Sequence, residues 1–400
     1  MFVIGAACRT VRAADTVASP TRSGVVLLLA FSWEGDSAAA LIERGVRFGV
    51  AHSDSTLGFD VVKCGSAYEV RAACDTLMQQ ESRRLIVFAG DEGAAAVVAI
   101  LSSQHRMPVL KLTGDSRSMT PLSNQFFEFL PSGETQGRTL GDFAARFLGL
   151  SGAMVYTPLD ARGRALADGF KSGFVKAGGA LEVQQWYPPD AMAIRPGIDA
   201  MFADTARKAL GGTRLNSALS PEERAQMFGS SQGGEVLYAG QADTLHGDSV
   251  RAREGFFFAL TPEHVEGFAK QLPTLAPKTV LLGNSSWVDL DVLERRETVT
   301  NGMYIVLPLM PEALDTSGFL VSYQQTGAVV NEWSLLGLDA GRFLGQVISG
   351  APRTRMDIAR ALTEAPRMTG ISVIVDFQKG HENTAARVVR YEDGGLRVVK

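Results

Sequence analysis

The sequence predicts an α/β protein with two Rossmann-like lobes, each built on a mostly parallel central sheet. Two observations support this fold class. Short apolar runs, typical of buried parallel strands, alternate with segments whose apolar residues recur at the helical period of 3.6. The alternation occurs in two series, one on each side of residue 137. Repeated strand–helix units of this kind place helices on both faces of a mostly parallel sheet.

The first series begins at Gly24, and its opening strand is apolar throughout, as expected for a strand buried on both faces. The helix after the second strand has Ser66 as its expected N-cap, with Glu69 three residues later. We expect strands near residues 25–29, 61–62, 85–89 and 109–112, and helices near 37–50, 67–78 and 93–103.

The second series begins near Gly137 and has the same alternation. It ends in two β-rich stretches that flank Asp393-Gly394, a pair that supplies the positive φ angles of a tight hairpin turn. We expect helices near residues 140–148, 166–174 and 263–272, and strands near 153–156, 181–187, 255–260, 279–282, 302–307, 387–391 and 396–399.

Two segments interrupt the pattern. Residues 190–250 contain Gly211-Gly212 and other turn signals and have too few apolar residues for a core of their own, so we expect a helical insertion on the second lobe. Residues 1–23 form a signal-like or disordered N-terminus, with a short apolar run followed by a Ser/Thr/Pro stretch. Export to a periplasmic or extracytoplasmic location is expected, the alternative being a disordered cytosolic tail. Cys8 is a candidate for lipidation, although Gly5 stands where Leu or Val is usual.

Composition and charge exclude several classes. The chain has 39 Lys and Arg against 43 Asp and Glu, a net charge of -4, and no basic stripe for nucleic acid. The longest apolar run near the start, residues 25–31, is too short to span a membrane. Three cysteines are too few for a disulfide scaffold, and we expect Cys64 and Cys74 to be two buried thiols rather than a bridge.

No motif indicates catalysis. The sequence lacks a phosphate loop, a nucleophile elbow and a Gly-x-Gly-x-x-Gly motif after the first strand. None of the five histidines is spaced four residues from another histidine or a cysteine. We therefore expect no enzymatic activity, no cofactor and no metal.

Candidate binding residues lie in loops that follow strands, where ligands of open α/β sheets bind. A tryptophan in a polar loop suits a planar or apolar ligand, a helix N-terminus suits a carboxylate, and Arg117 suits an anionic group. Asp91 and Glu92 oppose an anion at the helix N-terminus. The candidates in the first lobe are Ser32, Trp33, Glu34, Gly93, Ala94, Ser116 and Arg117. Those in the rest of the chain are Asp160, Arg162, Thr261, Glu263, Ser286 and Trp287.

The order of these parts resembles the type I periplasmic solute-binding proteins, in particular their leucine/isoleucine/valine-binding branch. The resemblance is carried by residues 25–50, 85–113, 125–137, 154–179 and 371–400. It implies three crossings between the lobes, near residues 137, 284 and 366. Lobe 1 would then comprise residues 24–137 plus 284–366, and lobe 2 residues 138–283 plus 367–400. It also implies that a small solute is captured between closing lobes and delivered to an inner-membrane ABC permease.

The sequence departs from the amino-acid binders of this family. Gly93 or Ala94 replaces the usual Ser after strand three, Arg162 replaces the usual Tyr before Gly163, and Glu128 replaces the usual Arg. Ser116 still matches the clamp for carboxylate and amine. Arg117 and Arg162 suggest an amino-acid-like or carboxylated ligand rather than a simple aliphatic amino acid.

A narrower resemblance supports an alternative function. Residues 280–293, together with 301–304, resemble the penicillin-binding-protein activator branch of the same fold. In that case the chain would be an envelope regulator that contacts another protein instead of a solute.

Overall fold

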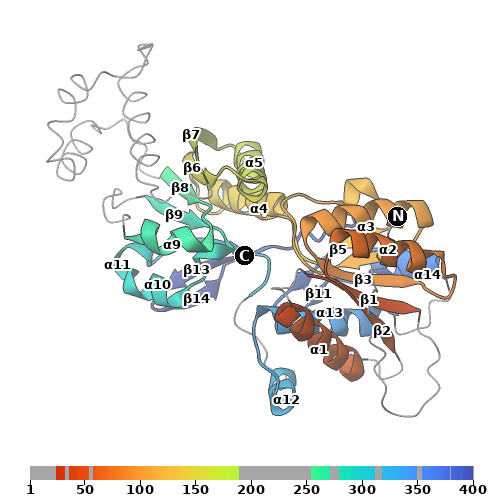
Figure 1. Cartoon of the computed structure of the whole chain (residues 1–400). Coiled ribbons are helices and arrows are strands. Elements are labelled where there is room, and N and C mark those ends of the chain that lie inside the picture. The colour runs from red at the N-terminus through yellow and green to blue at the C-terminus, as the bar shows by residue number, and fades with distance from the viewer. Residues whose placement is uncertain are drawn as a thin grey trace, which may run out of the picture. The chain divides into compact units, whose positions relative to one another are not determined.

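The computed structural model describes residues 24–31, 36–53, 57–188, 254–270, 279–310, 318–348, 354–378 and 380–399. The chain divides into two compact units (Figure 1). Unit 1 comprises Met1–Thr135 and Pro308–Arg387, and unit 2 comprises Gln136–Leu307 and Val388–Lys400. The N-terminal segment 1–23 and the expected insertion at 190–250 lie outside the described residues.

The chain passes between the units three times, after Thr135, after Leu307 and after Arg387. The second and third crossings were therefore predicted too early, at 284 and 366. Strand β10 (Tyr304–Leu307) pairs in parallel with β9 (Val280–Gly283), and this pairing keeps residues 284–307 in unit 2. Residues 371–373 are hydrogen-bonded to Asp339 of unit 1, which explains why the chain stays in unit 1 beyond residue 366.

Unit 1 contains a five-stranded sheet in the order β2-β1-β3-β4-β5. Every neighbouring pair in it is parallel. The strands are β1 (Val25–Ala30), β2 (Phe59–Cys64), β3 (Leu85–Gly90), β4 (Val109–Lys111) and β5 (Phe126–Glu128). The short strand β5 was not among the expected elements. Because all neighbours are parallel, the carboxyl ends of the strands meet at one edge of the sheet.

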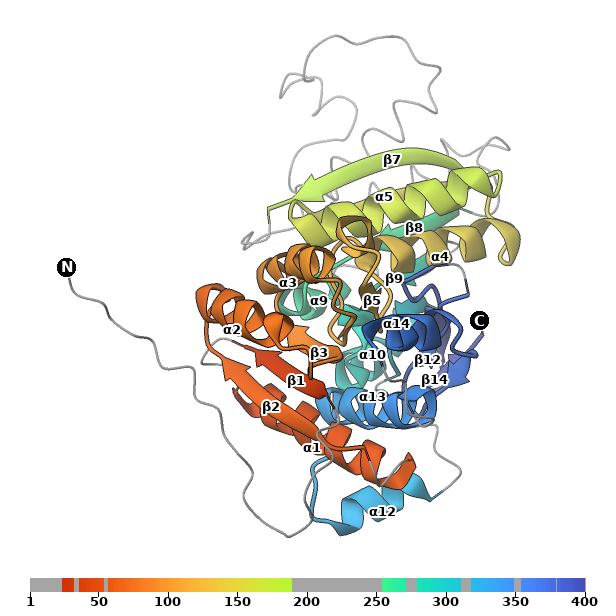
Figure 2. The ribbon, with the colours of Figure 1, turned by 90° about the vertical axis from the view of Figure 1, so that its right-hand side faces the viewer.

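Helices cover both faces of this sheet (Figure 2). Alternate residues of β1 enter two different cores: Leu27 packs in the core that contains residues of α1 and α13, and Leu28 packs with residues of α2 and α3. The helices are α1 (Asp36–Ser53), α2 (Ala67–Gln79), α3 (Glu92–His105), α13 (Glu332–Ile348) and α14 (Arg355–Thr363). Smaller elements of this unit are η2 (Thr120–Leu122), α12 (Phe319–Gln325), β11 (Met368–Thr369) and β12 (Ile374–Val375).

Helices α1 and α13 cross through glycines on both sides. A Cβ on Gly49 would lie 2.4 Å from Leu338 O and 2.9 Å from Arg342 N, and a Cβ on Gly341 would lie 2.5 Å from Val46 O. These neighbours are helix backbone atoms that cannot turn aside as a side chain can. The two helices therefore approach so closely only because both present glycine at the crossing.

Gly49→Ala should lower the free energy of unfolding by about 1–3 kcal/mol, because the added methyl group overpacks the helix crossing. Gly267→Ala is the matched control, since Gly267 lies in α9 (Pro262–Ala269) and its Cβ would meet nothing within 4 Å. That substitution should raise stability by up to about 1 kcal/mol through helix propensity. Urea unfolding of both variants measures the two effects, and equal changes in both would contradict the close crossing.

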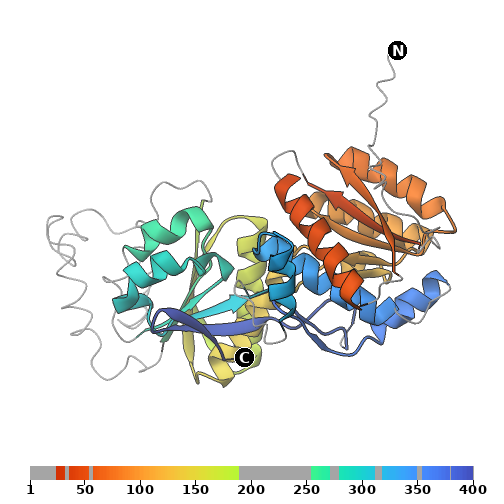
Figure 3. The same cartoon turned by 90° about the horizontal axis from the view of Figure 1, so that it is seen from below.

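Unit 2 contains a seven-stranded sheet in the order β14-β13-β10-β9-β8-β6-β7. The strands not yet given are β6 (Gly152–Pro158), β7 (Ala180–Tyr187), β8 (Glu254–Phe258), β13 (Arg387–Glu392) and β14 (Gly395–Val398). Parallel pairing connects five strands of this sheet, in the spatial order β7, β6, β8, β9 and β10. The last two strands, β13 and β14, form an antiparallel hairpin (Figure 3). Asp393 and Gly394 have φ of 51° and 78°, which confirms the turn predicted from their sequence.

The helices of unit 2 follow its strands. They are α4 (Gly133–Arg146), which begins just before the unit boundary, α5 (Ala161–Lys176), α9, η4 (Ser285–Trp287), α10 (Leu290–Arg295) and α11 (Glu297–Thr300). In the part of the chain that the structure describes, no helix has the length and apolar character needed to cross a membrane. Cys64 and Cys74 are both buried thiols outside any disulfide, as predicted, and burial raises the pKa of the Cys74 thiol to about 12.

Candidate functional site

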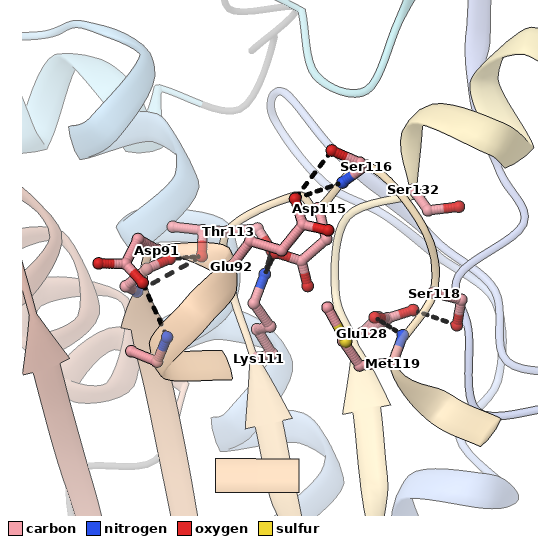
Figure 4. Close-up of polar contacts among 12 residues, drawn as sticks. Asp91, Glu92, Lys111, Thr113, Asp115, Ser116, Ser118, Met119, Glu128 and Ser132 are labelled. Atoms are coloured by element: carbon pink, nitrogen blue, oxygen red, sulfur yellow. Dashed lines mark hydrogen bonds and ion pairs between the residues drawn. The ribbon is translucent and has the colours of Figure 1, made fainter. Parts of the chain in front are cut away.

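The carboxyl edge of the unit 1 sheet brings two polar loops together. After β3, Asp91 caps α3 by accepting a hydrogen bond from Ala94 N at 2.7 Å. The loop after β4 is joined to the end of β3, because Thr113 Oγ1 donates to Gly90 O at 2.7 Å. The loop after β3 and the loop after β4 therefore lie side by side at this edge, and their polar side chains contact one another (Figure 4).

Ser116 connects this loop to α3. Its Oγ donates to Glu92 Oε2 at 2.8 Å, and its backbone N–H donates to the same oxygen at 3.3 Å. Ser116 is buried and Glu92 is partly buried. The carboxylate of Glu92 thus accepts hydrogen bonds from both donors of Ser116. Ser116 is the hydroxyl residue that matches the carboxylate-and-amine clamp of the amino-acid binders.

A buried ion pair lies directly beneath these residues. Lys111 Nζ lies 2.7 Å from Asp115 Oδ1, and the two side chains are 0% and 1% exposed. The lysine also donates to Thr113 O. Burial lowers the pKa of Lys111 and raises that of Asp115, while their mutual attraction opposes both shifts. The charges of Glu92 and Asp91 raise the pKa of Asp115 further.

Glu128 holds the far end of the same loop. Its carboxylate accepts hydrogen bonds from Ser118 Oγ at 2.6 Å and from Met119 N at 2.7 Å. Burial raises the pKa of Glu128 to about 7, the charge of Glu382 raises it as well, and the two hydrogen bonds and Lys111 act in the opposite direction. Glu128, which replaces the family's usual arginine, is therefore buried, and its carboxyl group holds the loop after β4 in place.

The raised pKa of Glu128 predicts a specific pH dependence. Its folded-state pKa lies above the unfolded value near 4.5, so its stabilising contribution is complete below that value and is lost as pH rises through 7. Between about pH 4 and pH 7, the free energy of unfolding of the wild type should fall by on the order of 3 kcal/mol relative to that of Glu128→Gln. Above pH 7 the difference between the two proteins should stay constant. Unfolding of both proteins across this range measures the difference. Glu364→Gln, at an exposed position, controls for the loss of one carboxylate, and a pH-independent difference for Glu128→Gln would contradict the prediction.

The carboxyl edge of the unit 2 sheet carries a second group of polar residues. Asp160 caps α5 by accepting from Gly163 N at 2.6 Å, and Arg162 Nη2 donates to Ser285 Oγ at 3.2 Å. Thr261 N donates to the Tyr187 hydroxyl at 3.2 Å, and burial raises the pKa of this tyrosine. These contacts join the loops after β6, β7, β8 and β9.

Asn284 fixes two of these loops in the manner of a backbone pair. Its Oδ1 accepts from Leu260 N at 3.1 Å and its Nδ2 donates to Leu260 O at 2.9 Å. The same Nδ2 lies 3.2 Å from Ser286 Oγ, so the asparagine also positions that serine. Asn284 therefore fixes the loops after β8 and β9 to each other.

The structure places most of the predicted residues in these two groups. Gly93, Ala94, Ser116 and Arg117 lie at the unit 1 edge, and Asp160, Arg162, Thr261, Glu263 and Ser286 lie at the unit 2 edge. Arg117 is partly exposed, with Nη1 3.7 Å from Glu134 Oε2. Ser32, Trp33 and Glu34 lie outside the described residues.

Trp287 was predicted to line the site, and this prediction is wrong. Its side chain is fully buried, and its Nε1 donates to Phe258 O at 3.0 Å. The short helix η4 turns the indole into the core, against the ring of Phe268 at 5.8 Å between centroids. An aromatic residue of this size is more stable in the core once its single donor has a backbone acceptor.

Sequence reasoning missed four residues that shape these edges. Lys111, Asp115 and Asn284 were not singled out, and Glu92 was considered only as a repulsive charge. A signal for Lys111 was present, because a lysine inside the apolar run 109–112 requires a buried counter-charge. Among the described residues, no group of three or more His, Cys, Asp or Glu side chains is arranged to hold a metal ion.

Comparisons with known proteins agree with this architecture. A family model described as periplasmic binding protein matches residues 65–395. Search of curated proteins gives no match to the sequence.

Solved structures share the fold at low sequence identity. A leucine-binding protein from Thermotoga maritima has 13% identity and a TM-score of 0.61, covering 94% of this chain and 97% of its own. An ABC transporter substrate-binding protein from Desulfitobacterium hafniense, in complex with Leu, has 15% identity, a TM-score of 0.62 and coverage of 94% and 99%. A solute-binding protein from Rhodopseudomonas palustris, in complex with 4-hydroxybenzoate, has 16% identity, a TM-score of 0.61 and coverage of 94% and 95%.

Proposed function

Because the chain belongs to the periplasmic binding protein family, we propose that it is an extracytoplasmic receptor that captures a small solute and delivers it to an ABC permease. The observation that carries the proposal is the pair of preorganised polar edges, one at the carboxyl ends of the strands in each unit. In parallel α/β sheets these ends are where ligands bind. The proposed role requires no chemical step, so we propose a binding protein rather than an enzyme.

We propose that the solute resembles an amino acid. Arg162 supports recognition of a carboxylate, because its guanidinium lies at the start of α5 beside the loop that contains Ser285. The protein from Desulfitobacterium is in complex with Leu and the one from Rhodopseudomonas with an aromatic acid, so the fold accommodates both kinds of solute. Both known solutes have a carboxylate, which is the group assigned here to Arg162.

A thermal-shift screen of amino acids, dicarboxylates, aromatic acids and short peptidoglycan fragments tests the proposal. A solute present at about 100 times its Kd should add about 2.7 kcal/mol of stability. A raised melting temperature for an amino acid or related acid is the expected result. A folded protein that responds to nothing in the panel would argue against a solute receptor.

Arg162→Ala should weaken binding of the responding carboxylate solute about tenfold or more, because a charged hydrogen bond to the carboxylate is lost. Arg164→Ala is the matched control, since Arg164 is an exposed arginine two residues along the same helix. Isothermal titration of the two variants with that solute measures the difference. Unchanged affinity in Arg162→Ala would remove Arg162 from the site.

The alternative, an envelope regulator that contacts a protein, rests on the resemblance of residues 280–293 together with 301–304. In this stretch Trp287 and Leu293 are fully buried. These two residues belong to the core of unit 2 and offer no contact surface, whereas Asp289 and Asp291 of the same stretch are exposed. If no solute in the screen raises the melting temperature, the regulator becomes the favoured interpretation. A pull-down from envelope extracts would then test it.

A further inference from the structure

The unit 1 edge is already occupied by carboxylates of the protein. Both donors of Ser116 bind Glu92 Oε2, and the N–H of Ala94 in the first turn of α3 binds Asp91 Oδ1. These are the kinds of donor that would receive a ligand carboxylate. An anionic solute would therefore have to displace Glu92 before it could use them.

The cations of this edge are matched as well. Lys111 is buried in its ion pair with Asp115, and Arg117 lies 3.7 Å from Glu134. In contrast, neither Asp91 nor Glu92 lies in an ion pair among the described residues. Carboxylates thus dominate the electrostatic potential at this edge. This potential attracts a positively charged group and repels a negatively charged one.

A separate observation supports a positive partner. Asp115 Oδ2 is buried and has no hydrogen-bond partner among the described residues, while Lys111 Nζ lies 2.7 Å from Oδ1. Buried carboxylate oxygens are normally satisfied, and an unsatisfied one is costly. Figure 4 shows the Asp115 carboxylate beside that of Glu92, so the charge of Asp115 adds to the negative field around Glu92.

We propose that Glu92 is a specificity-determining residue that closes the unit 1 edge to carboxylates and selects a solute group with a positive charge, such as an ammonium or guanidinium. The inference rests on the proposed solute-binding function and specifies the charge of the solute group that the unit 1 edge accepts. Solutes that carry only an anionic group would bind poorly.

The test compares each amino acid with its decarboxylated amine and its deaminated acid. Suitable sets are leucine with 3-methylbutylamine and 4-methylpentanoate, and phenylalanine with phenethylamine and 3-phenylpropanoate. Affinities are measured by isothermal titration for the wild type, for Glu92→Gln and for Asp91→Asn. Asp91→Asn is the matched control, because it removes a neighbouring charge, preserves an oxygen that can cap α3 and leaves the contacts of Ser116 unchanged. Unfolding midpoints establish that the variants fold.

The wild type should bind the amine of a set at least about tenfold more tightly than the acid. Glu92→Gln should shift this ratio toward the acid by about tenfold or more, whereas Asp91→Asn should shift it much less. A wild type that binds acids as tightly as amines, or a ratio unaffected by Glu92→Gln, overturns the inference while leaving the receptor function intact.

Failure of the proposed function has a different signature, namely a wild type that binds no member of any set. The response of Glu92→Gln then decides the inference by itself. Acid binding gained by Glu92→Gln would support the role of Glu92 in excluding carboxylates. Absence of binding in this variant as well would overturn both.

Discussion

Lys111→Met should lower the free energy of unfolding by about 3–5 kcal/mol, because it leaves Asp115 as a buried carboxylate without its counter-charge. Lys111 is completely buried, and its ammonium lies 2.7 Å from Asp115 Oδ1. The backbone oxygen of Thr113 also loses its donor. Urea unfolding at pH 7 measures the loss.

Two further variants test the cause. Lys63→Met is the matched control, since Lys63 is also a strand lysine but is 39% exposed and lies 3.2 Å from Glu43. It should cost less than about 1 kcal/mol. In Lys111→Met, adding Asp115→Asn should recover part of the loss, because the uncompensated charge disappears. Additive losses in the double variant would show that the ion pair is not the cause.

The defect of Lys111→Met should also depend on pH. Without the ammonium, burial and the charge of Glu92 raise the pKa of Asp115 with no opposing attraction. Since the folded-state pKa then lies above the unfolded value, the carboxyl group favours folding only while it is protonated. The stability deficit of the variant should therefore be smallest at low pH and grow as pH rises.

Asp339→Ala should cost a similar amount, about 3–5 kcal/mol, by removing the acceptor of a buried backbone loop. Asp339 on α13 is fully buried and accepts from the backbone N–H groups of Ile371, Ser372 and Val373 at 2.7, 2.7 and 2.9 Å. The serine hydroxyl donates to it as well, at 3.0 Å. All four donors, three backbone N–H groups and one hydroxyl, would lose this acceptor.

Asp75→Ala is the control for this substitution. Asp75 is a helical carboxylate of the same unit that is 45% exposed and lies 4.0 Å from Arg71. Its removal should change stability by no more than about 0.5 kcal/mol. Thermal unfolding compares the two variants directly. Equal effects at positions 75 and 339 would mean that the 371–373 loop does not depend on the aspartate.

Much of the fold could be predicted from local patterns. The strand residues 25–29 and 85–89 are apolar without interruption because helices cover both faces of the sheet, and this burial is visible in composition alone. The Asp393-Gly394 turn was predictable because few other residue pairs adopt its positive φ angles. Helix α13 was missed although apolar residues such as Leu335 and Phe343 mark its buried side. The two late crossings were misplaced because strand pairing between distant segments is not encoded in local periodicity.

The sequence by itself determined which loops carry polar residues and that they follow parallel strands, since strand order along the chain and the carboxyl-end rule require no coordinates. Only the tertiary structure decided what those residues do. It turned Trp287 into the core, paired Lys111 with Asp115, and placed the carboxylate of Glu92 on the donors of Ser116. The reason is physical: burial and hydrogen bonding depend on side chains that are 24 positions apart in the sequence, as Glu92 and Ser116 are, and come together only when the strands pair.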